Sequence, residues 1–137
     1  MTIKVFSRKK NNIDNRGYFV EFLNEDENFL DFRGQIYFTN IKRNCSRGNH
    51  YHKKRSELFC LVKGKIRVIT KNIKTNKISS KIIDSSNFQF KTFIIQPFVA
   101  HTFLNKYCSE AILISYSNKQ YKKNEKDVYN YKLDESS

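Results

Sequence analysis

Two histidines separated by one residue, His50 and His52, are the first feature of the sequence that could do chemistry. Alternate residues of a β-strand point to the same face, so an extended segment would hold both imidazoles on one side. Glu57 could join them if residues 53–56 form a short turn that returns the chain alongside. His101, the third histidine, starts another apolar, strand-like run far downstream. Imidazoles and a carboxylate that converge from separate strands would make either a metal site or an acid–base site.

Three histidines in a chain of this length could also be unrelated surface or core residues. Their spacing favours a shared pocket. The pattern H-x-H-x4-E-x6-G covers the first segment, and P-x3-H-x3-N follows around His101.

The elements that must position these residues are short strands, because the sequence shows almost no helical pattern. Residues 35–42 alternate between two faces, and residues 57–62 are almost continuously apolar, as is typical of a core strand. A polar turn is expected after residue 6, and the loop that follows residue 23 could contain one helical turn at residues 25–30. Many short strands of this kind predict an all-β sandwich or barrel. The expected strands cover residues 3–6, 17–23, 35–42, 47–52, 57–62, 66–70, 77–83, 92–96, 101–105 and 111–117.

Two of the expected strands, at residues 57–62 and 101–105, begin with a polar residue that is followed by an apolar one on the same face. Such strands suit a barrel that is closed by apolar side chains at one end and presents a polar pocket at the other. The alternating sets are Glu57, Phe59 and Leu61 on one strand and His101, Phe103 and Asn105 on the other.

The composition indicates one domain with a packed core, since the 137 residues are 39% hydrophobic and 15% aromatic. No apolar run reaches the length of a membrane span, and the first residues lack the apolar region of a signal peptide. Cys45, Cys60 and Cys108 are odd in number and lack a C-x2-C spacing, which argues against a disulfide framework. We therefore expect a soluble cytoplasmic protein with a single domain over residues 1–137, of which residues 118–137 form a charged C-terminal arm.

The net charge of +13 raises the question of nucleic-acid binding. The basic residues are spread along the chain, and no zinc-finger, helix-turn-helix or RNA-recognition pattern is present. A basic rim around a pocket would equally suit a small anionic ligand such as a diphosphate. We expect neither nucleic acid nor membrane as a partner.

The two histidine-bearing segments, GNHYHKKRSELFCLVKG and QPFVAHTFLN, resemble the two signature motifs of cupins, which are double-stranded β-helix (jelly-roll) barrels. DNRGYFVEFLNE and the stretch that begins GQIYFTNIKRN are similar to the C-terminal epimerase domain of bifunctional capsular-polysaccharide enzymes. The R-G-x-H-x-H-K-K string, with Tyr37 ten residues before its arginine, also resembles the stand-alone 3,4-ketoisomerases of dTDP-4-keto-6-deoxyglucose. The dTDP-4-dehydrorhamnose 3,5-epimerases are more distant. The resemblance covers residues 13–131.

The sequence shares some features with the capsular epimerase domain and others with the 3,4-ketoisomerases. The turn before His101 lacks the glycine usual in the second cupin motif, and the spacing from Pro97 to His101 follows the ketoisomerases. Glu57, however, keeps a metal-ligand glutamate that the ketoisomerases generally replace, and the C-terminal residues look more like those of the epimerase domain.

The resemblance implies an isomerase of a nucleotide-activated 4-keto-6-deoxy sugar in surface-polysaccharide biosynthesis. The 4-keto group acidifies the proton on C3, a base removes it, and the enediolate must be stabilised. Return of the proton to the other face of C3 is epimerisation, and its delivery to C4 is 3,4-ketoisomerisation. A histidine suits the base because its ordinary pKa is near 6.5. By match to the ketoisomerase motif we expect His50 as the base, His52 as the second candidate, and Tyr37 as the acid or oxyanion donor.

Arg47 is expected at the rim of the pocket, where its guanidinium could fork onto a diphosphate. Lys53 and Asn105 are further candidate substrate-binding residues. Lys53 could equally be solvated, and Asn105 could equally orient His101 or cap a turn. The expected ligand is a dTDP- or UDP-linked sugar, and the expected assembly is a homodimer.

His50, His52, Glu57 and His101 together suit zinc, iron, manganese or nickel. The ketoisomerases resembled here work without metal, whereas the capsular epimerase domain holds zinc. The cofactor is therefore either none or a divalent metal, with zinc first, since all four ligands are retained. Two alternatives remain open. One is a non-catalytic metal- or ligand-binding cupin, which would require neither Arg47 nor Tyr37, and the other is a cupin dioxygenase that uses iron at the same ligands.

Overall fold

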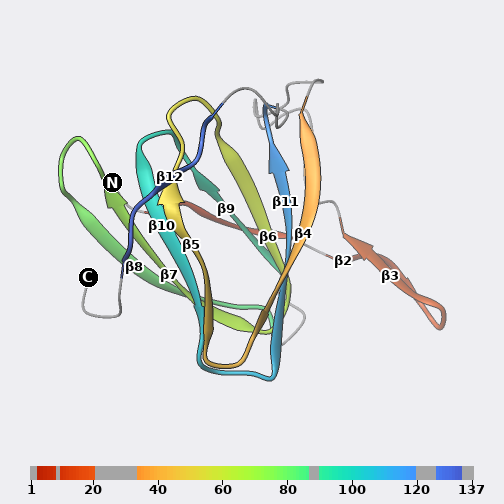
Figure 1. Cartoon of the computed structure of the whole chain (residues 1–137). Coiled ribbons are helices and arrows are strands. Elements are labelled where there is room, and N and C mark those ends of the chain that lie inside the picture. Colours follow the sequence, from red (N-terminus) through yellow and green to blue (C-terminus); the bar gives the residue numbers. More distant parts are fainter. Residues whose placement is uncertain (1–2, 9, 21–33, 87–89, 120–125, 134–137) are drawn as a thin grey trace.

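The computed structural model describes residues 3–8, 10–20, 34–86, 90–119 and 126–133. Every regular element in these ranges is a β-strand, and no helix within them could span a membrane. The strands form two five-stranded sheets that face each other, and a two-stranded hairpin that projects from them (Figure 1). This arrangement confirms the expected all-β cupin (jelly-roll) barrel.

All neighbouring strands are antiparallel. In order across the first sheet the strands are β1 (Val5–Arg8), β9 (Phe90–Ile95), β6 (Glu57–Lys63), β11 (Glu110–Ser117) and β4 (Gln35–Lys42). Across the second sheet they are β12 (Tyr129–Asn130), β5 (Cys45–Tyr51), β10 (Val99–Asn105), β7 (Lys65–Asn72) and β8 (Ile78–Asp84). The hairpin is β2 (Lys10–Asp14) and β3 (Gly17–Val20).

The chain changes sheet at almost every connection from β4 to β12, the β7–β8 hairpin being the exception. Strands that are far apart in the sequence therefore lie side by side, as β5 does with β10 and β6 with β11. This topology places the two histidine motifs on neighbouring strands of one sheet, although they are about fifty residues apart.

The side chains that point between the sheets form the core. Three rings at its centre, Phe59, Phe93 and Phe103, have centroids 4.8 to 5.7 Å apart. Offset and edge-on ring contacts of this kind add to the free energy of apolar burial. The aromatic cluster closes the barrel below the polar end, as the alternation on β6 and β10 predicted.

Glu57 joins the histidines, but not by the short turn at residues 53–56 that was considered as the way to bring it there. Both edges of β5 are already paired, one with β10 and the other with β12, so β6 cannot join it. Residues 53–56 instead cross to the other sheet, and Glu57 faces the histidines across the barrel.

The N-terminal residues also differ from the expectation. The strand expected at residues 3–6 is β1, which begins two residues later, and the expected polar turn contains β2, which pairs with β3. Polar side chains can occupy a projecting hairpin because backbone hydrogen bonds hold it, and its turn is supported by a hydrogen bond from Arg16 N to the Asp14 carboxylate. The helical turn expected at residues 25–30 lies outside the described residues.

Candidate active site

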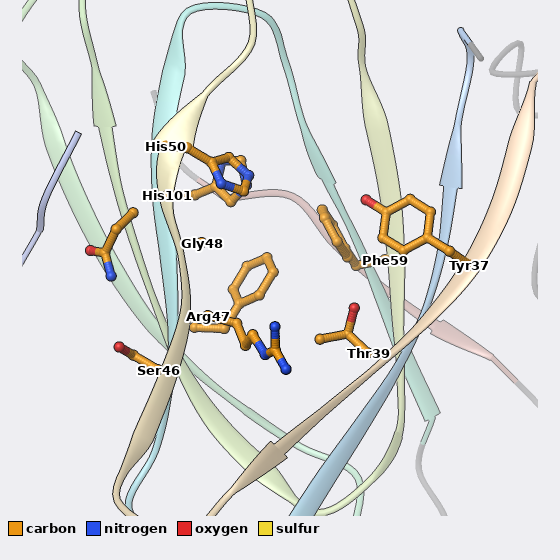
Figure 2. Close-up of a pocket in the computed structure, with 10 residues that line it drawn as sticks. Tyr37, Thr39, Ser46, Arg47, Gly48, His50, Phe59 and His101 are labelled. Carbon is orange, nitrogen blue, oxygen red and sulfur yellow. The ribbon is translucent and has the colours of Figure 1, made fainter. Parts of the chain in front are cut away.

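A cavity of about 410 Å³ opens between the two sheets, a volume in the range of small-molecule sites. Figure 2 shows that its walls come from opposite sheets: Tyr37 and Thr39 project from β4, while Arg47 and His50 project from β5. The aromatic cluster forms part of its wall. The lining residues are Tyr37, Thr39, Ser46, Arg47, Gly48, Asn49, His50, Phe59, His101 and Phe103.

An irregularity in β5 aims His50 into this cavity. The pairing with β10 shifts by one residue, so that His50 pairs with His101 and Gly48 pairs with Thr102. Gly48 has φ +107° and Asn49 has φ +53°, and a Cβ at Gly48 would lie 2.7 Å from the His101 carbonyl oxygen. A β-bulge of this kind bends the strand and redirects its side chains, and glycine accepts both the φ angle and the close approach.

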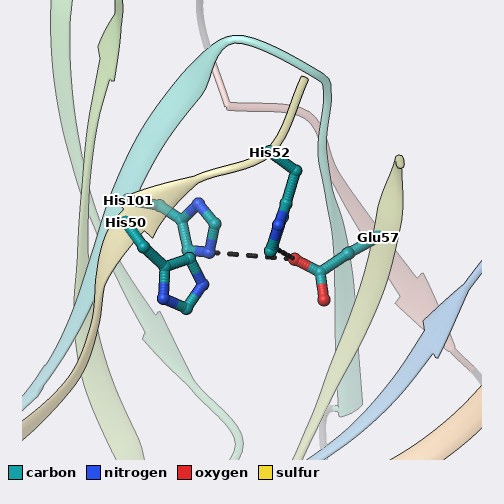
Figure 3. A group of neighbouring side chains, drawn as sticks. All are labelled: His50, His52, Glu57 and His101. Atoms are coloured by element: carbon teal, nitrogen blue, oxygen red, sulfur yellow. Dashed lines mark ion pairs between the residues drawn. The ribbon is translucent and has the colours of Figure 1, made fainter. Parts of the chain in front are cut away.

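At the cavity wall, three imidazoles and one carboxylate meet, and His50 and His101 among them line the cavity (Figure 3). The ring centroid of His50 lies 4.7 Å from that of His101 and 4.9 Å from that of His52. Glu57 reaches them from β6, and one ligand atom from each of the four residues lies within 4.8 Å of the others. The structure thus brings together all four residues that the sequence selected as candidate ligands.

Two backbone carbonyls set the orientation of the buried imidazoles. Nδ1 of His52 lies 2.5 Å from the carbonyl oxygen of Asp127, and Nδ1 of His101 lies 3.1 Å from that of Val99. A carbonyl oxygen only accepts, so we assign the ring proton to Nδ1 in both histidines. In this tautomer Nε2 carries no proton, and it faces Glu57, at 2.8 Å from Oε1 for His52 and 3.9 Å for His101.

This arrangement fits a divalent metal ion. Among the described residues, neither Nε2 of His52 nor Oε1 of Glu57 has a hydrogen-bond partner, although the two side chains are only 5% and 2% exposed. Two acceptors 2.8 Å apart repel each other unless a proton or a cation lies between them. Histidines whose Nδ1–H donates to a carbonyl are typical metal ligands, and nitrogen with oxygen donors suits zinc.

The charges of the site follow from its burial and its contacts. Burial raises the pKa of Glu57, but the contact with His52 and the charges of His101 and His52 outweigh it, and the pKa is lowered to about 2. Burial, followed by repulsion from His101 and His52, lowers the pKa of His50 to about 4. Burial also lowers the pKa of His101. At neutral pH the site therefore holds the Glu57 carboxylate beside the neutral imidazoles of His50 and His101.

Tyr37 connects the cavity to this buried group. Its hydroxyl donates a hydrogen bond to Oε2 of Glu57, whose other oxygen faces His52. Burial, together with the charge of Glu57, raises the pKa of Tyr37, so the hydroxyl stays protonated. Tyr37 can therefore donate a hydrogen bond to an oxygen in the cavity, in exchange for its bond to Glu57.

Of the three candidate substrate-binding residues, one lines the cavity and two do not. Arg47 lines the cavity, as expected. Lys53 does not, and its ammonium lies 4.3 Å from the centre of the Tyr129 ring. Asn105 is fully buried below the cavity, where its amide donates to the carbonyl oxygens of Ile41 and Cys108 at 2.8 and 3.0 Å. Of the three roles considered for Asn105, which were substrate binding, the orientation of His101 and the capping of a turn, these contacts match the last.

Sequence reasoning missed several residues of the site. Thr39 could have been found, because it stands two residues from Tyr37 on an alternating strand and must share its face. Asn49 and Asp127 carried no comparable signal. Asp127 lies in the charged C-terminal arm, and only the fold brings its carbonyl to His52.

Comparisons with known proteins place the chain in a family and show a shared fold. A family model described as the polysaccharide biosynthesis C-terminal domain matches residues 12–129. The capsular polysaccharide assembling protein CapF from Staphylococcus aureus is a similar solved structure, with a TM-score of 0.68 and 24% identity over 92% of this chain and 34% of that chain. A dTDP sugar isomerase from Desulfovibrio desulfuricans G20 has a TM-score of 0.82 and 14% identity over 98% of this chain and 86% of that chain.

A 3,4-ketoisomerase from Helicobacter canadensis has a TM-score of 0.73 and 20% identity, over 92% of this chain and 88% of that chain. At these identities the three structures show a shared fold. The chain spans about a third of the length of CapF. The comparison with curated proteins found no match.

Proposed function

The chain belongs to the polysaccharide biosynthesis C-terminal domain family, and we propose that it is an isomerase of a nucleotide-activated 4-keto-6-deoxy sugar. It acts by proton transfer at C3, as a 3,4-ketoisomerase or a C3 epimerase, in the synthesis of a surface polysaccharide. One observation carries the proposal: a cavity holds the neutral imidazole of His50, the protonated hydroxyl of Tyr37 and the guanidinium of Arg47. Together they supply a base, a donor to the developing oxyanion and a cation for the anionic part of the substrate, the three functions that suit proton removal next to a ketone.

His50 is the proposed base. It lines the cavity, and its lowered pKa of about 4 keeps it unprotonated at neutral pH. His52, the second candidate, does not line the cavity, because its Nδ1 is bound to the Asp127 carbonyl and its Nε2 faces Glu57. The carboxylate of Glu57 favours the imidazolium that His50 becomes when it takes the proton from C3.

Tyr37 is the proposed donor to the oxygen that becomes negative. When the C3 proton leaves, charge develops on the keto oxygen, and a hydroxyl that stays protonated stabilises it by a hydrogen bond. In a ketoisomerisation the C4 oxygen takes a proton, the C3 hydroxyl gives one up as C3 becomes the ketone, and His50 returns its proton to C4. In an epimerisation C4 becomes the ketone again, and C3 takes a proton on the face opposite to the one that lost it, while the proton on His50 is released.

Arg47 is the proposed anchor for the diphosphate of the nucleotide sugar. Its guanidinium stands in the wall of the cavity, and a planar fork of N–H donors matches two phosphate oxygens. A dTDP- or UDP-linked sugar is the proposed ligand, and the similar structures of a dTDP sugar isomerase and a 3,4-ketoisomerase support this choice.

The four clustered residues would hold a divalent metal, with zinc as our first choice. Bound there, the metal would act as a Lewis acid on an oxygen of the substrate. His50 cannot be a ligand and a base with the same nitrogen at the same time. We therefore propose His52, Glu57 and His101 as the permanent ligands, and this leaves His50 free to accept the proton.

We further propose a cytoplasmic homodimer. The free cysteines Cys45, Cys60 and Cys108 suit a reducing compartment. On the edge strand β4, Ile36 and Phe38 are 65% and 73% exposed, and a second copy would cover them. The hairpin of β2 and β3, which projects from the barrel in Figure 1, offers a second surface for this contact.

Proton NMR of the reaction products tests the proposed function. The protein is mixed with dTDP-linked and with UDP-linked 4-keto-6-deoxyglucose, each with and without a chelator. We expect a new sugar spin system with one of them, and its ring couplings distinguish a 3-keto product from a C3 epimer. Loss of the reaction with chelator would show that the metal is functional. No product with either substrate, together with tight zinc binding, would favour the alternative of a non-catalytic metal-binding cupin.

A further inference from the structure

Residues 126–133, which we call the C-terminal strap, lie along the outer edge of the strand that carries His50. Within the strap, β12 pairs with β5, so that Tyr129 is opposite Tyr51 and Asn130 is opposite His50. Figure 1 shows this blue segment beside the yellow β5. Two more hydrogen bonds join the strap to Asn49: Tyr131 N donates to its carbonyl oxygen at 2.8 Å, and Leu133 N donates to its Oδ1 at 2.9 Å.

The carboxylate of Asp127 holds the crossing between the two sheets. Its Oδ1 accepts from the backbone N–H groups of Lys53 and Lys54 at 2.8 and 3.1 Å, and its Oδ2 accepts from that of Arg55 at 3.1 Å. The guanidinium Nε of Arg55 lies 3.5 Å from Oδ2. Hydrogen bonds to an ionised acceptor are strong, and a carboxylate that is 10% exposed has little water to replace them. One carboxylate therefore holds three of the four residues of the crossing between His52 and Glu57, and the fourth, Ser56, donates its N–H to Oδ1 of Asn118 at 2.9 Å.

The same residue also holds the imidazole of His52. The carbonyl oxygen of Asp127 accepts from Nδ1 of His52 at 2.5 Å, and this leaves Nε2 facing Glu57 at 2.8 Å. The side chain of Asp127 fixes where its own carbonyl stands, since the carboxylate is bound to the three residues that follow His52. Without the carboxylate, the pairing of β12 and the two bonds to Asn49 still hold the strap, but they begin two or more residues after Asp127 and leave its carbonyl less tightly placed.

We propose that Asp127 is a positioning residue for the active site, and that it keeps His52 in the Nδ1–H tautomer facing Glu57. It touches neither the cavity nor the reacting atoms. Its effect passes through His52 and through the crossing at residues 53–55. The inference deepens the proposed function and rests on it only for the kinetic part of the test.

The test uses Asp127→Asn in the full chain, because an amide keeps the size of the side chain but puts a donor where Oδ2 accepts from Arg55. In the wild type, nitrogen-15 NMR of the histidine rings should show His52 protonated at Nδ1. In the variant we expect a mixture of tautomers, zinc affinity lower by about tenfold or more, and kcat lower by a similar factor with KM within about twofold. Asp84→Asn is the matched control, since Asp84 accepts from a backbone N–H, that of Ser86, in a turn after β8.

A second variant keeps the test decisive if Asp127→Asn does not fold. Leu133 is buried at the end of the strap and packs in a cluster with Ile69 and Ala100, so Leu133→Ala loosens the strap without touching the carboxylate. We expect the same three changes, each smaller. The inference is overturned if His52 keeps its tautomer and zinc affinity is unchanged in the folded variants while only the melting temperature falls. The tautomer and the zinc affinity are measured without any sugar, so a wild-type protein without turnover would contradict the proposed function and leave this test intact.

Discussion

At the scale of single residues, the site is organised around Glu57. Its two carboxylate oxygens face different groups, Oε1 the imidazoles of His52 and His101 and Oε2 the hydroxyl of Tyr37. A positive charge that enters the site, whether a metal ion or the proton that His50 accepts, is therefore next to a buried negative charge. In a site with little water such a charge acts more strongly than at the surface.

The hydroxyl of Tyr37 should act on the rate more than on binding. In Tyr37→Phe the ring remains and the donor to the developing oxyanion is lost, so we expect kcat to fall about 100-fold or more with little change in KM. Steady-state kinetics with the nucleotide sugar that gives product measures both constants.

Tyr107→Phe is the control for this loss. Tyr107 accepts a hydrogen bond from Arg67 and does not line the cavity, so its removal should leave kcat unchanged. A Tyr37→Phe variant with the kcat of the wild type would contradict the role of Tyr37 as donor.

At the scale of elements, the bulge in β5 decides where His50 points. Gly48→Ala places a Cβ 2.7 Å from the backbone oxygen of His101 at a φ angle of +107°. We expect a loss of about 1–3 kcal/mol in the free energy of unfolding, together with a loss of activity in the protein that remains folded, because β5 must move away from β10. Urea unfolding and kinetics at a temperature where the variant is folded measure the two effects.

Gly64→Ala provides the comparison, since Gly64 also has a positive φ angle, +93°, and its Cβ would meet Cys108 and Ala111 in the turn after β6. This variant should lose stability and keep its activity per folded molecule. Equal activity of the two folded variants would show that the bulge does not position His50.

The strands themselves were largely predictable from local pattern. The alternation at residues 35–42 matches β4 residue for residue, because one face of that strand is half-buried or buried and the other is exposed. The direction of the crossing after His52 was not predictable. It depends on the partners of β5, and one of these is β12, about eighty residues later in the chain. β3 lies within the strand expected at residues 17–23, but its partner β2 was missed, since backbone pairing rather than apolar alternation forms it.

The residues of the candidate site can also be divided into those that the sequence could predict and those that it could not. His50, His52, Glu57 and His101 could be selected because the chemistry of a motif is local in the sequence. The part played by Asp127 could not, since the bonds that give it a role join it to residues more than seventy positions away. Asn105 had the residue type and the strand position of a binding residue, and only its contacts assign it to a turn.

At the scale of the whole molecule, the barrel leaves an apolar edge uncovered. Phe38 on β4 is 73% exposed, so Phe38→Glu costs the folded monomer little and should place a charge in the proposed dimer contact. We expect a dimer for the wild type and a monomer for this variant by light scattering coupled to size-exclusion chromatography.

Ile82→Glu is the matched change on β8, in the other sheet, and it should stay dimeric. A wild-type monomer at all protein concentrations, or a dimer that survives Phe38→Glu, would place the contact elsewhere or remove it.

Deuterium exchange at C3 of the sugar tests the central claim, that His50 removes the C3 proton, most directly. The wild type, His50→Asn and Lys53→Ala are each incubated in D2O with the 4-keto sugar nucleotide, and loss of the C3–H signal is followed by proton NMR. We predict rapid loss with the wild type and with Lys53→Ala, whose side chain lies outside the cavity. With His50→Asn, folded as judged by circular dichroism and melting temperature, the signal should persist. Exchange by His50→Asn at the wild-type rate would contradict the account.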